Sequence, residues 1–206
     1  MIRITCLSLL ALPLIAQSPF RLTRHAGLPQ IAYGDKFASG DIDLFVANDN
    51  AANQLLLNDG RGRFVDATAG RFVMQPGLNA THSVDLVDID GDGDLDILIG
   101  NDDNLSNRVY TNNGLGFFTD VTATALPPNV GFTENQVVAD FDGDGDVDWL
   151  TVDAGPCHFY ENNGAGVFTD QSATRLLGLS QVFGSRYDVT PFATDIDGDG
   201  DLDVMI

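Results

Sequence analysis

The sequence is poor in cysteine, lysine, glutamate and long apolar runs, and each shortage excludes a class of protein. The two cysteines are Cys6 and Cys157; because Cys6 lies in an apolar leader, an internal disulfide is not expected in the mature chain. Lys36 is the one lysine, and the net charge of −20 disfavours binding to the phosphates of nucleic acids. No apolar run approaches the roughly 20 residues that a membrane helix needs, so the sequence predicts no membrane span.

Aspartate and glycine are abundant instead. Only Glu134 and Glu161 among the 30 acidic residues are glutamates, and the chain has 22 glycines. Aspartate combined with glycine is typical of turns and of metal loops built from oxygen ligands. With 44% apolar residues the chain has enough hydrophobic material for a folded core.

The N-terminus is typical of an export signal. Arg3 supplies a positive start, residues 4–15 are almost wholly apolar, and Ala16 is a small residue at a possible cleavage point. We therefore expect residues 1–16 to be a signal peptide and the mature protein to be secreted, extracellular, periplasmic or on the cell surface. The alternative, a buried first helix, is disfavoured by Pro13 inside the run.

Two motifs repeat in phase along residues 17–206. The acidic string Asp-x-Asp-Gly-Asp-Gly-Asp-x-Asp starts at positions 88, 140 and 195, and a degenerate copy starts at position 35. A second string, Asn-Asn-Gly or Asn-Asp-Gly followed by x-Gly, starts at positions 58, 112 and 162. Such a constant offset indicates repeated structural units, of which the last is truncated at the end of the chain.

Each unit predicts about four short strands and no helix. Residues 42–47, 95–99 and 147–152 are apolar or β-branched runs that follow the acidic loops, and residues 108–111 and 158–161 form the next strand. The Asn-Gly strings supply residues that accept positive φ in a tight hairpin. Phe64, Phe118 and Phe168 then open the returning strand. The expected fold class is all-β, with four-stranded blades of a β-propeller.

The aspartates of the acidic loops predict a metal cage. In an extended strand their carboxylates would repel one another along one face, but glycines at positions 4 and 6 let the chain curl until the carboxylates converge. Calcium takes six to eight oxygen ligands in flexible geometry, whereas zinc and copper prefer histidine or cysteine. We expect the side chains at positions 1, 3, 5 and 9 and the backbone carbonyl at position 7 to bind Ca²⁺. The alternative is an acidic solvated turn without a metal. The predicted ligand residues are Asp88, Asp90, Asp92, Asp94, Asp96, Asp140, Asp142, Asp144, Asp146, Asp148, Asp195, Asp197, Asp199, Asp201 and Asp203.

The first loop is degenerate. Phe37 and Ser39 replace two ligands there and leave Asp35, Asp41 and Asp43. An acidic turn without a metal is the preferred interpretation of this loop.

The acidic loop followed by a hydrophobic strand resembles the FG-GAP/VCBS repeat of integrin α-subunit propellers and of many secreted bacterial proteins. The companion string that begins at Asn112 is similar to the repeats found with ASPIC/UnbV domains and in cartilage acidic proteins. This resemblance implies calcium-binding loops within a seven-bladed propeller that serves adhesion or ligand binding. Seven such units would need about 370 residues, so we expect a partial propeller of about three to four blades, with the remaining blades in a longer chain.

Three functions remain open from the sequence. The first, which we favour, is a secreted binding or adhesion module for an extracellular protein or glycan. The second is the scaffold part of a larger extracellular enzyme, such as a polysaccharide-cleaving one, whose active residues lie beyond Ile206. The third is a structural surface spacer. The chain itself is expected not to be an enzyme, since it carries no nucleophile-elbow, zinc-protease or phosphate-loop motif.

The cysteine, histidines and large aromatic residues outside the two motifs are expected to have structural roles. Cys157 occupies a repeat position and is expected to be a buried structural thiol. His82 and His158 are expected to be surface or core histidines. Trp149 and Tyr160 are expected to lie in a blade core, with a sugar-binding platform as the alternative.

Overall fold

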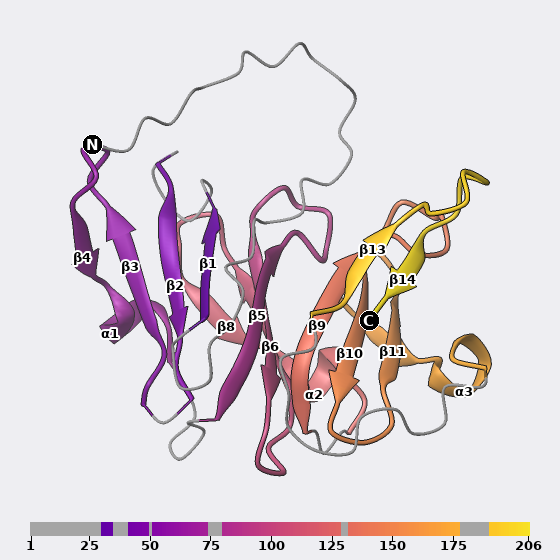
Figure 1. Cartoon of the computed structure of the whole chain (residues 1–206). Helices are drawn as coiled ribbons and strands as arrows, with labels where there is room; N and C mark the ends of the chain where they lie inside the picture. The colour runs from indigo at the N-terminus through magenta and orange to yellow at the C-terminus, as the bar shows by residue number, and fades with distance from the viewer. Residues whose placement is uncertain (1–29, 35–40, 50, 74–79, 129–131, 178–189) are drawn as a thin grey trace, which may run out of the picture.

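The computed structural model describes residues 30–34, 41–49, 51–73, 80–128, 132–177 and 190–206. The expected signal peptide, residues 1–16, and Asp35 lie outside these residues. Three sheets have four antiparallel strands each, in sequence order, and a further sheet has two. Figure 1 shows them side by side, from the indigo sheet to the yellow hairpin. The prediction of an all-β fold with four-stranded blades is confirmed, and the open arrangement is compatible with part of a propeller.

The first three sheets have the same anatomy, and the last sheet holds one hairpin. Their strands are β1 (Gln30–Gly34), β2 (Asp43–Ala47), β3 (Gln54–Asn58) and β4 (Phe64–Asp66); β5 (Thr81–Val87), β6 (Asp96–Asn101), β7 (Arg108–Asn112) and β8 (Phe118–Asp120); β9 (Thr133–Ala139), β10 (Asp148–Asp153), β11 (His158–Asn162) and β12 (Phe168–Asp170); and β13 (Phe192–Thr194) and β14 (Asp203–Met205). Each acidic loop joins the first two strands of its sheet.

A four-residue helical segment follows the last strand of each four-stranded sheet, although in the first sheet its middle residues, Ala69 and Gly70, do not have helical backbone angles. These helices are α1 (Thr68–Arg71), α2 (Thr122–Ala125) and α3 (Ser172–Arg175). In the second sheet, Thr122 donates its backbone N–H to Asp120 Oδ1 at 3.0 Å, and its Oγ1 accepts the backbone N–H of Val109 at 3.0 Å. The sequence did not predict these helices because one turn is too short to show a 3.6-residue period.

Two hydrophobic clusters hold the sheets together. The second sheet contributes to both of them, because successive side chains of a strand point to opposite faces: Ile97 and Ile99 join the first cluster and Leu98 joins the second. The first cluster includes Phe72, whose ring centroid lies 4.7 Å from that of Tyr110. The chain therefore forms its core between neighbouring sheets.

Strands β5 and β9, the first strands of the second and third sheets, meet through polar side chains. Strand β5 contacts both β1 and β9. Gln136 of β9 is fully buried and donates from Nε2 to Asp85 Oδ2 at 2.9 Å and to the carbonyl oxygen of Leu98 at 3.2 Å. Ser83 donates from Oγ to Gln136 Oε1 at 2.9 Å. These side-chain hydrogen bonds hold β5 and β9 in a fixed position relative to each other.

Candidate metal centre

Each intact acidic loop is wrapped around its first aspartate. Asp88 accepts the backbone N–H of Gly91 on Oδ1 at 2.8 Å and that of Gly93 on Oδ2 at 2.9 Å. The two glycines have φ values of 76° and 92°, in the region that side chains with a Cβ rarely adopt. Asp140 and Asp195 receive the equivalent bonds. The curled loop that the glycine positions predicted is therefore present in all three copies.

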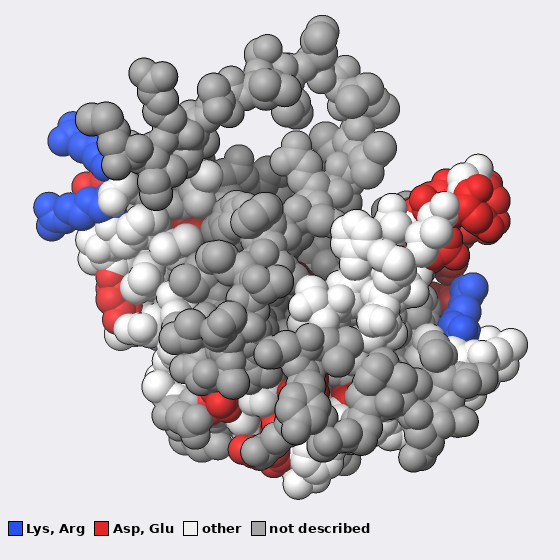
Figure 2. All heavy atoms as spheres, in the orientation of Figure 1, with Lys and Arg blue, Asp and Glu red and all other residues white. Residues whose placement is uncertain are grey.

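Carboxylates converge at these loops. One oxygen each of Asp88, Asp90 and Asp96 lie within 4.8 Å of one another, and Asp140, Asp142 and Asp148 repeat this arrangement. In the fourth loop the converging residues are those at positions 1, 3 and 5, namely Asp195, Asp197 and Asp199. Figure 2 shows acidic side chains gathered at the tip of the β13–β14 hairpin, where this loop lies.

The ninth aspartates of the second and third loops, Asp96 and Asp148, are fully buried, whereas Asp203 of the fourth loop is exposed. A buried carboxylate without a compensating cation is electrostatically unfavourable. The pKa of Asp96 is raised to about 7, chiefly by burial; backbone hydrogen bonds act against this rise, and the nearby carboxylates of Asp90 and Asp92 add to it. Burial likewise raises the pKa of Asp148 to about 6. A bound dication would favour the charged form of both carboxylates. With only oxygen donors converging on one point, the residues present fit Ca²⁺.

The seventh aspartate turns its side chain away from the cage. A Cβ added to Gly114 would lie 2.5 Å from Asp94 Oδ2, so the Asp94 carboxylate rests on the Asn-Gly turn of the next hairpin. Asp146 lies against Gly164 and Asp41 against Gly60 in the same way. The carboxylate at position 7 is therefore in contact with the turn, and the backbone carbonyl at this position stays the predicted metal ligand.

Hydrogen bonds explain why the two repeated motifs keep a constant offset. Asp96 accepts the backbone N–H of Asn112 on Oδ1 at 2.7 Å and that of Ile89 on Oδ2 at 3.1 Å. The Asn112 side chain donates to the carbonyl oxygen of Leu95 at 3.1 Å and accepts the N–H of Gly116 at 3.1 Å. Acidic loop and Asn-Gly turn thus form one hydrogen-bonded unit.

The Asn-Gly strings supply residues with positive φ in the hairpin turns, as the sequence predicted. Positive φ falls on the glycines of the Asn-Gly strings, such as Gly114 at 76° and Gly116 at 73°. In the described part of the chain, none of the asparagines of these strings has a positive φ. Their side chains accept or donate hydrogen bonds in the turn instead, which is a common use of asparagine.

Of the degenerate first loop, the structure describes only residues 41–43. Asp43 is fully buried and accepts the backbone N–H of Asn58 at 2.7 Å, which matches the bond between Asp96 and Asn112. Burial raises the pKa of Asp43. The hydrogen bond between the ninth aspartate and the Asn-Gly turn is thus retained in the loop in which Phe37 and Ser39 stand at two predicted ligand positions.

Cys157, Trp149 and Tyr160, which lie outside the two motifs, are buried, as the sequence predicted. Cys157 is buried and free, and burial raises the pKa of its thiol. Trp149 and Tyr160 are almost fully buried in the second hydrophobic cluster. The environment of His82 was not anticipated, because its acidic neighbours come from other units: it is buried beside Asp102 and Glu134. The one sequence signal is that His82 stands where the next unit has Glu134.

Comparison with known proteins identifies the repeat. The FG-GAP-like repeat matches this chain three times, over residues 38–99, 88–151 and 140–206. Cartilage acidic protein 1 of Homo sapiens is 31% identical over 132 residues, which cover 62% of this chain and 19% of that protein. The mouse (Mus musculus) protein of the same name is 32% identical over 123 residues, covering 57% of this chain and 18% of that protein. The chain thus spans about a fifth of the length of these curated relatives. The repeat matches extend over most of the sequence, and the chain belongs to the FG-GAP-like repeat family.

Proposed function

We propose that this chain is the calcium-stabilised part of an extracellular β-propeller that binds a protein or glycan ligand and catalyses no reaction. Family membership supports a propeller module for extracellular binding. The leader expected at residues 1–16 supports secretion. Among the described residues, no helix is long and apolar enough to cross a membrane.

The observation that carries the proposal is the convergence of carboxylates in the repeated loops. Asp96 and Asp148 are fully buried, yet each lies within 4.8 Å of two further carboxylates through one oxygen. Buried like charges destabilise a fold unless a cation compensates them. With the millimolar affinities typical of extracellular calcium modules, ambient Ca²⁺ would add about 1 kcal/mol of stability for each site.

A non-catalytic role agrees with how the reactive groups are used. The loop aspartates have a complete explanation as metal ligands and as acceptors of backbone N–H groups. The Cys157 thiol is buried and its pKa is raised, which disfavours the thiolate that a cysteine nucleophile needs. Binding specificity in such a module would lie in the connecting loops.

Binding assays test this proposal. The purified protein is passed over arrays of extracellular-matrix proteins and glycans, once with millimolar Ca²⁺ and once with a chelator. We expect retention on at least one class of ligand in calcium and at least a tenfold loss of binding in chelator. A protein that binds neither class in calcium would support the spacer function instead, and cleavage of a polysaccharide would support the enzymatic one; both results contradict the proposal.

A further inference from the structure

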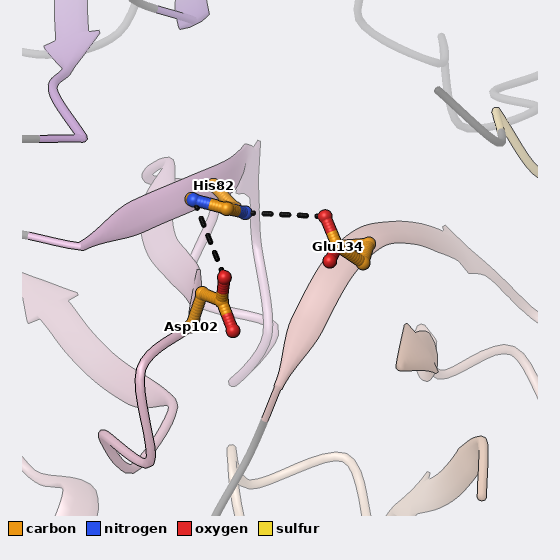
Figure 3. Close-up of side chains that lie close together, drawn as sticks. All are labelled: His82, Asp102 and Glu134. Atoms are coloured by element: carbon orange, nitrogen blue, oxygen red, sulfur yellow. Dashed lines mark hydrogen bonds and ion pairs between the residues drawn. The ribbon is translucent and has the colours of Figure 1, made fainter. Parts of the chain in front are cut away.

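Four titratable side chains meet at the end of the sheets opposite the acidic loops. His82 lies at the start of β5, Glu134 at the start of β9, and Asp49 and Asp102 directly follow β2 and β6. Three of the repeat units therefore contribute to one cluster. Figure 3 shows His82 between Asp102 and Glu134, which approach it from different strands.

Both nitrogens of the His82 ring face carboxylates. Nδ1 lies 3.3 Å from Glu134 Oε2, while Nε2 lies 3.2 Å from Asp49 Oδ1 and 3.6 Å from Asp102 Oδ2. A neutral imidazole carries one N–H, so one of its nitrogens would direct a lone pair at a carboxylate. A cation bound at that nitrogen removes this repulsion.

The cluster is strongly anionic, and all its side chains except that of Asp49, which is 30% exposed, are buried. The side chains of His82, Asp102 and Glu134 are 9%, 5% and 9% exposed. Three carboxylates outweigh a single imidazole, so the four groups carry a charge of −2 even when the imidazole is protonated. A dication bound to neutral His82 would bring them to −1. Buried charges in proteins are paired or coordinate metals, because burial otherwise costs too much free energy.

A buried hydrogen-bond ladder holds the candidate ligands in place. Thr81, the neighbour of His82, accepts from Asn53 Nδ2 at 2.9 Å and donates to Asn101 Oδ1 at 3.1 Å. Asn101 in turn precedes Asp102 in the chain. In the next unit Thr133, the neighbour of Glu134, accepts from Asn107 Nδ2 at 3.0 Å. The backbone positions of all three residues are therefore fixed by contacts that do not use the cluster itself.

The donor set differs from that of the acidic loops. One nitrogen of His82 and one oxygen each of Asp102 and Glu134 lie within 4.8 Å of one another. Calcium prefers oxygen ligands alone, whereas zinc binds histidine nitrogen together with carboxylate oxygen at about 2.0–2.2 Å. Ligand atoms around a tetrahedral ion of this size are about 3.3 Å apart. Because Glu134 faces Nδ1 and Asp102 faces Nε2, side-chain rotation must bring both carboxylates to one ring nitrogen when the ion binds.

We propose that His82, Asp102 and Glu134 bind a divalent transition-metal ion of the Zn²⁺ type, with Asp49 as a further carboxylate at the imidazole ring. This site goes beyond the calcium loops and does not depend on them. The ion would link the second and third sheets at the end opposite the acidic loops, with Asp49 of the first sheet beside the imidazole ring.

Zinc titration in saturating Ca²⁺ tests the site, with a chromophoric zinc chelator as competitor. We expect one Zn²⁺ per chain and at least a tenfold weaker affinity for His82→Gln and for Glu134→Gln. The matched control is His158→Gln, because His158 also faces a carboxylate, Asp153 Oδ2 at 2.6 Å, but lies outside the cluster. This control should keep the affinity of the unchanged protein.

Co²⁺ provides a second readout that does not depend on affinity. A visible d–d spectrum is expected for the unchanged protein and for His158→Gln, and its loss is expected for Glu134→Gln, which preserves the shape of the side chain. Circular dichroism confirms that each variant is folded. The absence of zinc uptake by the unchanged protein, or equal uptake by folded His82→Gln and Glu134→Gln, would overturn the proposal.

Discussion

Asp90 and Asp94 lie in the same loop and yet have different surroundings. The Asp90 carboxylate is one of three that converge on the candidate calcium position, whereas the Asp94 carboxylate rests on Gly114. We therefore expect Asp90→Asn to lower the calcium stoichiometry by one ion and Asp94→Asn to leave it unchanged. Isothermal titration calorimetry measures both values, and an equal loss in the two variants would contradict the assignment of position 7 to its backbone carbonyl.

The close packing around Gly100 leaves no room for a side chain at this position. A Cβ at this position would collide with Ser83 Oγ and would lie 2.6 Å from Thr133 Cγ2 and 2.8 Å from Gln136 Oε1. Overpacking of this kind costs about 1–3 kcal/mol, so Gly100→Ala should lower the free energy of unfolding by that amount in a urea titration. Gly155→Ala is the matched control, because nothing lies within 4 Å of its added Cβ. Equal stability of the two variants would show that β5 and β9 are not packed as described.

His158 makes stability depend on pH. Its hydrogen bond to Asp153 raises the pKa of the imidazole, against a lowering by burial. A raised pKa in the folded state means that the pair stabilises the fold fully below the unfolded value of about 6.5 and loses this contribution as the pH rises through the folded value. The melting temperature of His158→Gln should therefore lie furthest below that of the unchanged protein near pH 5.

The two melting temperatures should approach each other as the pH rises above the unfolded value of about 6.5 and through the raised pKa of the His158 imidazole. Because both proteins carry the same acidic loops, the difference between them isolates the pair. A gap that widens as the pH rises would refute the role of the imidazolium.

At the scale of the element, the loop and the Asn-Gly turn form a single unit. The buried side chain of Asn112 bonds to Leu95 and Gly116, whereas the neighbouring Asn113 is exposed and bonds only within its own turn. Leaving buried backbone groups without partners costs about 1–3 kcal/mol. Asn112→Ala should lower the free energy of unfolding in that range, and Asn113→Ala should cost less than 1 kcal/mol. Denaturation by guanidinium measures both; a larger loss for Asn113→Ala would contradict this account.

The strands could be predicted because their signals are local. The run that follows each acidic loop was expected at residues 95–99 and 147–152, and the structure has β6 at Asp96–Asn101 and β10 at Asp148–Asp153. The one-turn helices were missed because four residues show no helical period. The positive φ in the turns was predictable from the Asn-Gly strings, whereas the hydrogen bonds of the asparagine side chains were not anticipated.

At the scale of the whole molecule, the repeat predicted which residues are equivalent but not which ones meet. The convergence of carboxylates in the acidic loops was predictable because the converging residues of a loop lie within nine consecutive positions. The environment of His82 was not, because Asp49, Asp102 and Glu134 reach it from three units whose packing no local pattern specifies. The ladder from Asn53 through Thr81 to Asn101 is likewise visible only once the sheets lie side by side.

Thermal unfolding with and without calcium tests the central claim most directly, namely that bound ions hold the glycine-hinged loops closed and thereby stabilise the sheets. Three occupied loops at about 1 kcal/mol each correspond to a shift of roughly 6–12 °C for a chain of this size. The account predicts that a chelator lowers the melting temperature by this amount and that excess Ca²⁺ restores it. An unchanged melting temperature in chelator would contradict it.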